Sequence, residues 1–257
     1  MKYLNDISYK DCVGKVCKSK SSGDFKVLKY NGSKDVEIQF LKTGYETIVQ
    51  LGNIKSGKVK DPYAPSVYGI GISGTKYLIS EGDVLTKEYM LWQNMLQRCY
   101  SDNSKKKNPT YDGCEVSENF KCYEYFYEWC NEQIGFGVDG FELDKDLLVK
   151  GNKVYSEDTC VFIPKEINLL LTKCIASRGE HFIGVSWSNI SKTFVAIVRK
   201  NKGKSEYLGH FKTEIEAFNA YKKAKELYIK EVANKWKYKI DERAYNALMN
   251  YEVEIDD

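Results

Sequence analysis

The residues best suited to chemistry lie in the stretch LDKDLLVKGNKVYSEDTCVF, residues 143–162. An acidic pair, Asp144 and Asp146, brackets Lys145, and the polar turn KGNK follows before YSEDTC and an apolar run. Two interpretations are open. The acidic side chains can hold a divalent cation for hydrolysis, or the polar residues can simply build the turn of an ordinary hairpin.

The charge of the chain is unevenly distributed around this stretch. Residues 1–60 carry 12 Lys and Arg against 6 Asp and Glu, and residues 178–239 carry 14 against 6. Residues 61–177 are acidic, with 12 against 18, and residues 240–257 carry 1 against 6. Two basic flanks around an acidic middle favour a protein that grips a polyanion at both ends.

Composition limits the class of protein. With 257 residues, 42% hydrophobic and 29% charged, the chain is expected to form several globular domains. No apolar run approaches the roughly 18 residues of a membrane helix, so no membrane partner is expected. The N-terminus MKYLNDISYKDC has no apolar core or cleavage signal, which predicts a cytoplasmic protein.

The N-terminal part predicts a small β domain over residues 1–61. Alternating apolar and polar residues, with an Asn-Gly turn at Asn31, predict about four strands between residues 12 and 59. Residues 62–85, which are rich in proline and glycine, are expected to form a linker or strap.

A central domain is expected over residues 86–174. It begins with a helix capped by Thr86 and continues with an aromatic helix capped by Ser117, which we interpret as a core helix. The strands FELDKDLL and VYSEDTCVFI, joined by the turn VKGNK, then lead into a helix near Pro164.

The C-terminal part, residues 178–240, predicts three alternating strands and a long helix capped at Thr213. The expected apolar face of that helix consists of Ile215, Phe218, Ala220, Tyr221, Ala224, Leu227, Tyr228 and Val232. Residues 241–257 are expected to form a short helix with an acidic tail. The predicted fold class is therefore α+β and multi-domain.

The C-terminal segment resembles a known DNA-binding family. IGVSWS, TFVAIVRKNKGK and YLGHFKTEIEAFNAY match in order the APETALA-type domain over residues 179–236, except that Phe194 stands where the family usually has tryptophan. That family lays its sheet in the major groove of double-stranded DNA. The resemblance implies these DNA-binding residues: Arg178, Ser186, Trp187, Lys192, Arg199, Lys200, Lys202 and Lys204. His210 is expected to pack at the edge of the sheet.

The middle region, roughly residues 68–172, resembles the HNH (His-Asn-His) endonuclease-like proteins of phages, which are often fused to APETALA-type modules. LWQNMLQRCYSD, NPTYDGCEVSENF and FELDKDLLVKGNKVYSEDTCVFIPKEIN carry the resemblance. It implies that Asp144 and Asp158 hold one Mg²⁺, that Asn152 occupies the loop position, and that Lys145 and Asp146 belong to the catalytic group.

Lys145 occupies the position where that family has its histidine. A lysine with an ordinary pKa near 10.4 is a poor base at neutral pH but a good phosphate ligand. Three interpretations follow. The centre cleaves DNA with another base, such as Asp146, Glu157 or Tyr155; it binds DNA without cutting; or the hairpin is only structural.

Five of the eight cysteines lie in the middle region: Cys99, Cys114, Cys122, Cys130 and Cys160. Because no CxxC pair is present, buried thiols are the preferred interpretation and a Zn²⁺ site is the alternative.

The sequence as a whole therefore predicts a phage protein that acts on double-stranded DNA in the cytoplasm of its bacterial host. Its expected activity is metal-dependent hydrolysis of phosphodiesters, and its rival is a regulator or accessory factor that binds DNA without cutting it. A factor that contacts a host protein through the aromatic helix is a third possibility. The oligomeric state and the target sequence are not encoded in any pattern that we recognise.

Overall fold

The computed structural model describes residues 12–172, 180–200 and 203–255. The chain divides into two compact units, Met1–Trp129 and Cys130–Asp257. Both units combine helices with small antiparallel sheets, so the predicted α+β class is confirmed. Within the described ranges, no helix has the length and apolar character needed to cross a membrane. The DNA-binding candidates Arg178 and Lys202 lie outside the described residues.

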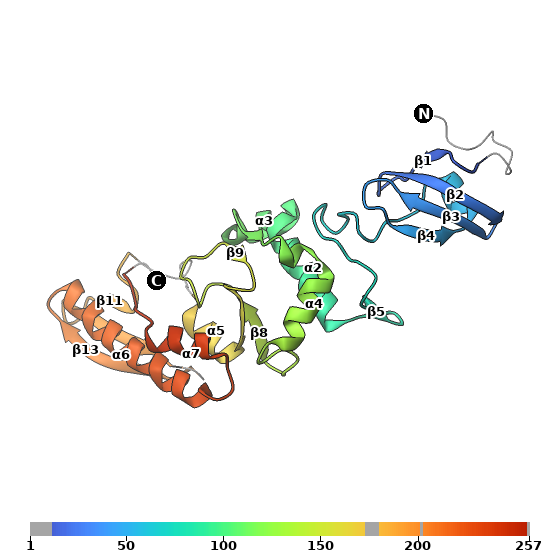
Figure 1. The fold of residues 1–257 in the computed structure, drawn as a ribbon. Coiled ribbons are helices and arrows are strands. Elements are labelled where there is room, and N and C mark those ends of the chain that lie inside the picture. The colour runs from blue at the N-terminus through green and yellow to red at the C-terminus, as the bar shows by residue number, and fades with distance from the viewer. Residues whose placement is uncertain (1–11, 173–179, 201–202, 256–257) are drawn as a thin grey trace. The chain divides into compact units, whose positions relative to one another are not determined.

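The first unit begins with a four-stranded antiparallel sheet (Figure 1, blue). Its strands follow the order of the chain: β1 Val16–Lys18, β2 Asp24–Gly32, β3 Asp35–Phe40 and β4 Glu46–Val49. The predicted meander is confirmed, and the turn between β2 and β3 follows the Asn-Gly pair. The short helix α1, Leu51–Ser56, was not predicted, because its six residues show too little helical periodicity.

The strap that follows, residues 62–85, is held through its backbone by the carboxylate of Glu124. It contains the two-stranded hairpin of β5 Ser80–Glu81 and β6 Val84–Leu85. The Oε1 atom of Glu124 accepts hydrogen bonds from the backbone N–H groups of Thr75 and Lys76, at 2.8 and 2.7 Å. Gly74 is required beside this carboxylate, because a Cβ there would lie 2.2 Å from the same oxygen.

Two helices form the rest of the first unit's core. Helix α2, Lys87–Tyr100, is capped by Thr86 as predicted. The short elements α3 Asp102–Lys107, η3 Pro109–Tyr111, β7 Glu115–Val116 and η4 Asn119–Lys121 lead to α4, Tyr123–Glu132. The predicted start of the aromatic helix is wrong. Ser117 caps only the 3₁₀ turn through Phe120, and the α-helix begins at Tyr123.

The interpretation of that aromatic helix as a core element is confirmed. Phe120, Tyr123 and Phe126 are fully buried. The rings of Phe120 and Phe126 meet edge-on with centroids 5.1 Å apart, and Trp92 donates its indole N–H to the carbonyl of Phe120. Such edge-to-face contacts are typical of a packed interior.

The second unit contains the hairpin with the acidic pair. Strand β8, Phe141–Asp144, pairs antiparallel with β10, Val161–Pro164, and helix α5 follows at Lys165–Leu171. The predicted order of strand, turn, strand and helix is present, but the strands are shorter than predicted. Pairing stops at Asp144, and residues 145–160 form a loop that includes the short strand β9, Val154–Tyr155.

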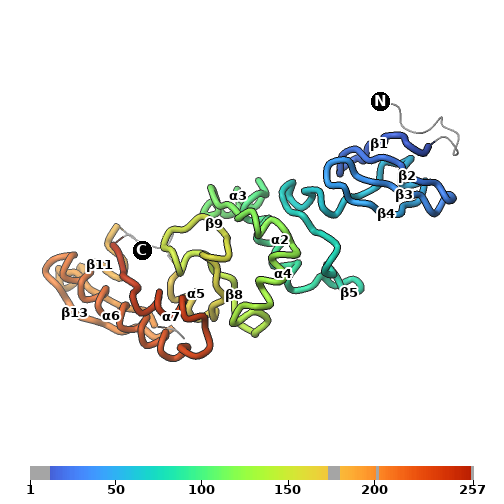
Figure 2. Tube along the Cα trace, viewed as in Figure 1, coloured from blue at the N-terminus to red at the C-terminus, as the bar shows by residue number. Residues whose placement is uncertain are grey.

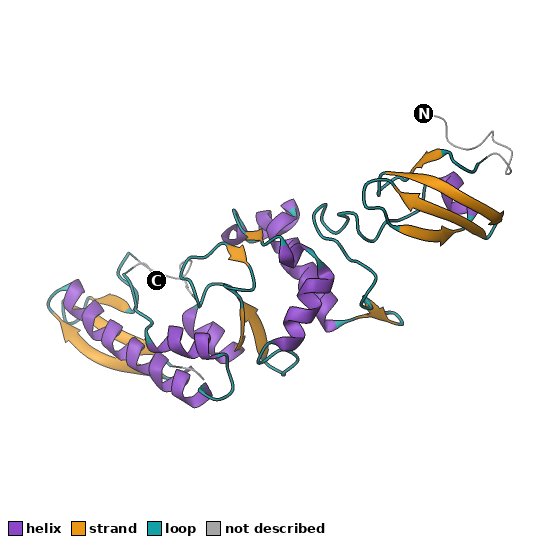
Figure 3. Ribbon diagram, in the orientation of Figure 1, coloured by secondary structure: helices purple, strands orange, loops and turns teal. Residues whose placement is uncertain are grey.

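The C-terminal sheet and helix match the prediction closely (Figure 3). Strands β11 Val185–Ser188, β12 Thr193–Arg199 and β13 Ser205–Phe211 are antiparallel, and α6 Glu214–Trp236 follows with a capping box at Thr213. Helix α7, Glu242–Met249, is the predicted short helix of the tail. The predicted apolar face of α6 is partly wrong, because Ile215 and Leu227 are 47% and 60% exposed. Ala217, Ile229 and Ala233 are buried instead.

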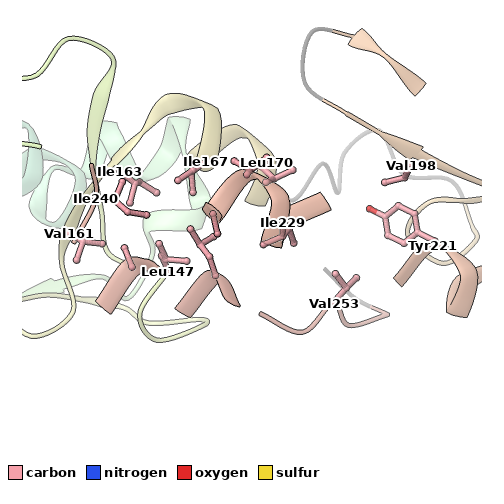
Figure 4. Packing of buried hydrophobic residues seen from close by; sticks show 14 of the residues in the cluster. Leu147, Val161, Ile163, Ile167, Leu170, Val198, Tyr221, Ile229, Ile240 and Val253 are labelled. Atoms are coloured by element: carbon pink, nitrogen blue, oxygen red, sulfur yellow. The ribbon is translucent and has the colours of Figure 1, made fainter. Parts of the chain in front are cut away.

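Helix α6 packs against both the sheet and the hairpin. One buried cluster contains Ala196 and Val198 of β12, Ile163 of β10 and Ile167 of α5 together with residues of α6. Figure 4 shows the hairpin's contribution, with Ile167 and Leu170 on α5 and Ile229 on α6. At the C-terminal end of α6, the indole N–H of Trp236 donates to Glu166 at 2.8 Å. The hairpin therefore helps to fix the helix that supports the sheet.

Candidate functional site

Lys145 holds the loop of the hairpin from inside. The residue is only 7% exposed. Its Nζ atom donates to Oδ1 of Asp146 at 2.5 Å and to the backbone carbonyl of Asn152 at 2.8 Å. Figure 2 shows residues 145–160 as a broad loop that leaves β8 and returns before α5. The ammonium group thus links the start of this loop to its midpoint, seven residues later.

The polar atoms of Asp144 and Asn152 also form hydrogen bonds within the loop. Oδ1 of Asp144 accepts the backbone N–H groups of Asp146 and Leu147, at 2.9 and 2.7 Å, as in a side-chain turn. The amide of Asn152 donates to the carbonyls of Lys145 and Val154 and accepts the N–H of Val154. Burial raises the pKa of the Asp144 carboxyl, with the neighbouring Asp146 adding to the effect.

The other residues predicted for this centre lie in different surroundings. Asp158 is exposed in the turn of residues 156–159, and Arg243 approaches the carbonyls of Glu157 and Asp158 at 3.3 and 3.5 Å. Tyr155 is buried, with its ring centroid 5.8 Å from Nζ of Lys145. The structure therefore brings Asp144, Lys145, Asp146 and Asn152 together.

The fit of these residues to a metal ion can be judged from their donor atoms. Oδ1 of Asp144 is engaged by two backbone N–H groups. In the ranges that the structure describes, no group of three or more histidine, cysteine, aspartate or glutamate side chains is placed to hold a metal. The ligand pair Asp144 and Asp158 is thus not completed into a coordination shell, and we derive no chemical step through Mg²⁺ or Zn²⁺.

The cysteines of the middle region are not joined by disulfides. Cys99, Cys114, Cys130 and Cys160 are buried, and Cys122 is half-buried. Burial raises the pKa of Cys160 to about 12, so this thiol stays protonated at neutral pH. A protonated, desolvated thiol serves as a small apolar side chain in a core.

The C-terminal sheet has one covered and one open face. Ala196 and Val198 are fully buried on the side of α6. Because side chains alternate along a strand, Val195, Ile197 and Arg199 lie on the opposite side. The register extends this face to β11 and β13, since Ser186 pairs with Val195, and Tyr207 pairs with Ile197.

The open face combines hydrogen-bonding, apolar and cationic groups. His210 pairs with Val195, and its ring centroid lies 5.7 Å from that of Tyr207. Nδ1 of His210 lies 2.8 Å from the hydroxyl of Thr193. Tyr207 is 56% exposed and Ile197 is 37% exposed. The residues of this face, which we call the open sheet face, are Ser186, Ser188, Thr193, Val195, Ile197, Arg199, Ser205, Tyr207 and His210, and none of them is acidic.

Two of the predicted DNA-binding residues lie on the helix side of the sheet. Lys200 forms an ion pair with Glu206 at 2.7 Å, and its Nζ lies 5.4 Å from the centre of the Tyr228 ring on α6. Trp187 pairs with Phe194 in the register, and their rings meet edge-on at 4.9 Å. Both side chains contact residues of the module itself, although Trp187 is still 40% exposed.

Four other predicted residues are exposed on or beside the open sheet face. Ser186 and Arg199 lie on it, and Lys192 and Lys204 lie in the turns at its ends. Lys192 has a left-handed backbone, with φ of 54°. Sequence reasoning missed Ile197 and Tyr207 as members of this face. Because side chains alternate along a strand, counting two positions back from the predicted residue Arg199 would have found Ile197.

No protein-family model matches the chain, and the searches of curated proteins and of solved structures returned no significant match either.

Proposed function

We propose that this protein binds double-stranded DNA through the open sheet face. The observation that carries the proposal is the composition of that face: an exposed arginine among serine, threonine, tyrosine, histidine and aliphatic residues, without a carboxylate. Lys192 and Lys204 add positive charge at its two ends. A phosphate backbone attracts such a surface, and an acidic surface would repel it.

The dimensions of the sheet also support this proposal. Neighbouring strands lie about 4.8 Å apart, so three strands span about 10 Å. The major groove of B-form DNA is about 12 Å wide. Arg199 can donate to guanine, and Ile197 can contact the methyl group of thymine, which are two of the pairings by which proteins read base edges.

The hairpin and α5 support the helix that carries the C-terminal sheet. Its core residue Ile167 joins the cluster around α6, and Glu166 accepts the indole N–H of Trp236. Lys225 of α6 donates to the carbonyl of Leu170 at the end of α5. These contacts hold the helix against which the sheet packs, and the loop residues Asp144, Lys145 and Asn152 keep the hairpin closed.

The test compares two adjacent basic residues, Arg199 at the end of β12 and Lys200 directly after it, whose side chains lie on opposite sides of the sheet. Duplexes bound by the full chain are first selected from a random pool, and the affinity of the selected sequence is then measured. Arg199→Gln is expected to weaken binding by about 1–3 kcal/mol and to relax the base preference. Lys200→Gln removes the same charge from the helix side and is expected to leave the base preference unchanged. Equal losses in the two variants would reject the open sheet face as the reading surface.

Phosphodiester hydrolysis is the second candidate function. One observation favours it: the half-buried carboxylate of Asp144 ends β8, and the strand, loop, strand and helix follow in the order that the resemblance to HNH proteins implies. A nicking assay on supercoiled DNA in Mg²⁺, Mn²⁺ or EDTA tests this candidate. Metal-dependent nicks that disappear in a folded Asp144→Ala variant would establish it, whereas nicks that persist in that variant would remove Asp144 from the reaction.

A further inference from the structure

A polar pocket in the first unit lies on the exposed side of α2, away from the buried side of that helix. Its volume is about 420 Å³, which is within the range of small-ligand sites. The buried residues of α2, among them Trp92 and Met95, face the core. The lining residues come from α2, α3 and η3: Asn94, Gln97, Arg98, Ser104, Asn108 and Tyr111.

The chemistry of this lining selects for an anion. Arg98 is the only charged residue among those that line the pocket, and each of the others carries an N–H or O–H donor. The guanidinium carbon of Arg98 lies 5.5 Å from the centre of the Tyr111 ring, a cation–π contact that restrains its plane. A half-buried guanidinium with a fixed plane suits the paired oxygens of a phosphate.

The surroundings point to a chain of phosphates rather than a single one. Lys105, Lys106 and Lys107 follow one another on α3, directly after the lining residue Ser104. A run of lysines attracts polyanions and raises their local concentration. It can also contact several phosphates of an extended ligand at once.

We propose that this pocket binds a backbone phosphate of nucleic acid, with Arg98 as the principal ligand. The choice of nucleic acid rests on the proposed function, but the site belongs to a different unit and makes its own contact. The protein would then hold DNA at two places: the open sheet face reads bases, and the Arg98 pocket holds phosphate irrespective of sequence.

The experiment uses the full chain, a short fluorescent duplex and its single strand, and fluorescence anisotropy over a series of KCl concentrations. Three variants each lower the net charge by one: Arg98→Gln, Gln97→Glu and Lys87→Gln. Lys87 lies at the first residue of the same helix and outside the pocket lining. Gln97 is exposed, so Gln97→Glu tests the pocket even if Arg98→Gln lowers the stability of the fold.

Arg98→Gln and Gln97→Glu are expected to weaken binding about tenfold, with Lys87→Gln close to the wild type. Arg98→Gln is also expected to reduce the slope of log K against log salt by about 0.9. Equal losses in all three variants would mean that net charge alone acts, and unchanged binding in Arg98→Gln would exclude the phosphate contact. Either result overturns the proposal.

Two further measurements distinguish this proposal from a site for free phosphate and from the proposed function. Thermal stabilisation by inorganic phosphate at matched ionic strength, lost in Arg98→Gln while DNA binding stays unchanged, would identify a free-phosphate site and overturn the proposal. Arg199→Gln distinguishes this inference from the proposed function. If Arg199→Gln leaves DNA binding unchanged while Arg98→Gln weakens it, the open sheet face is rejected and the Arg98 pocket is supported. If Arg98→Gln leaves DNA binding unchanged while Arg199→Gln weakens it, the Arg98 pocket is rejected and the open sheet face is supported.

Discussion

Replacing Lys145 by methionine decides whether this residue builds the loop or does chemistry. Methionine keeps most of the apolar length of the side chain, so little cavity is created. The carbonyl of Asn152 loses its donor at 2.8 Å, which costs about 1–3 kcal/mol in a buried setting. Asp146 has a side chain that is 54% exposed and remains hydrated, so the lost ion pair adds only about 0–1 kcal/mol.

Part of this loss is offset, because a buried cation no longer has to be desolvated. The expected net loss of unfolding free energy is therefore about 1–3 kcal/mol. Calorimetry on the full chain measures it as a fall in Tm, at about 2–8 °C per kcal/mol for units of this size. The matched control is Lys153→Met, an exposed lysine of the same loop, whose Tm is expected to change little. Equal shifts in the two variants would refute the structural role of Lys145.

Two more predictions concern stability. Gly184 and Gly203 both have φ of +73°, but a Cβ on Gly184 would lie 2.0 Å from the Tyr221 ring, whereas a Cβ on Gly203 meets no described atom within 4 Å. Gly203→Ala is expected to lower the free energy of unfolding by about 1–2 kcal/mol through backbone strain alone. Gly184→Ala is expected to lower it by about 2–5 kcal/mol, because the contact with the Tyr221 ring adds overpacking. Equal losses in thermal unfolding would contradict this packing. Burial raises the pKa of Asp144, so its protonated form favours the fold and that contribution is lost as the pH rises through the folded pKa. Asp144→Asn keeps an acceptor at Oδ1, and its Tm relative to the wild type is expected to rise as the pH increases from about 4; a difference that does not vary with pH would show that the ionised carboxylate carries no such cost.

Local signals in the sequence predicted the elements well where a few adjacent residues decide the structure. The capping residues Thr86 and Thr213 start their helices as expected, because each side chain accepts an N–H from the first turn. The Asn-Gly pair, which ends β2, likewise stands directly before the turn to β3. At these positions the deciding contacts lie within three or four residues.

Predictions that depend on distant contacts were less accurate. Ile215 and Leu227 fit the helical period of α6 but are exposed, because the actual contact stripe follows the crossing of this helix over the sheet. Lys200 lies on the helix side because it is two residues after Val198 and four after Ala196, both of which face the helix. The sequence shows that side chains alternate between the two faces, but only the packing decides which set faces the helix. The burial of Lys145 depends on the closure of its loop onto Asn152, which no local pattern encodes.

The central claim, that the open sheet face binds DNA, is tested most directly by methyl NMR of the full chain during titration with a selected duplex. Ile197 and Val198 are adjacent on β12 and lie on opposite faces, with Ile197 exposed and Val198 fully buried against the helix side. The methyl signals of Val195 and Ile197 are expected to shift on binding, and those of Val198 to stay nearly constant. If the duplex binds while the signals of Val195 and Ile197 do not move, the open sheet face is not the interface.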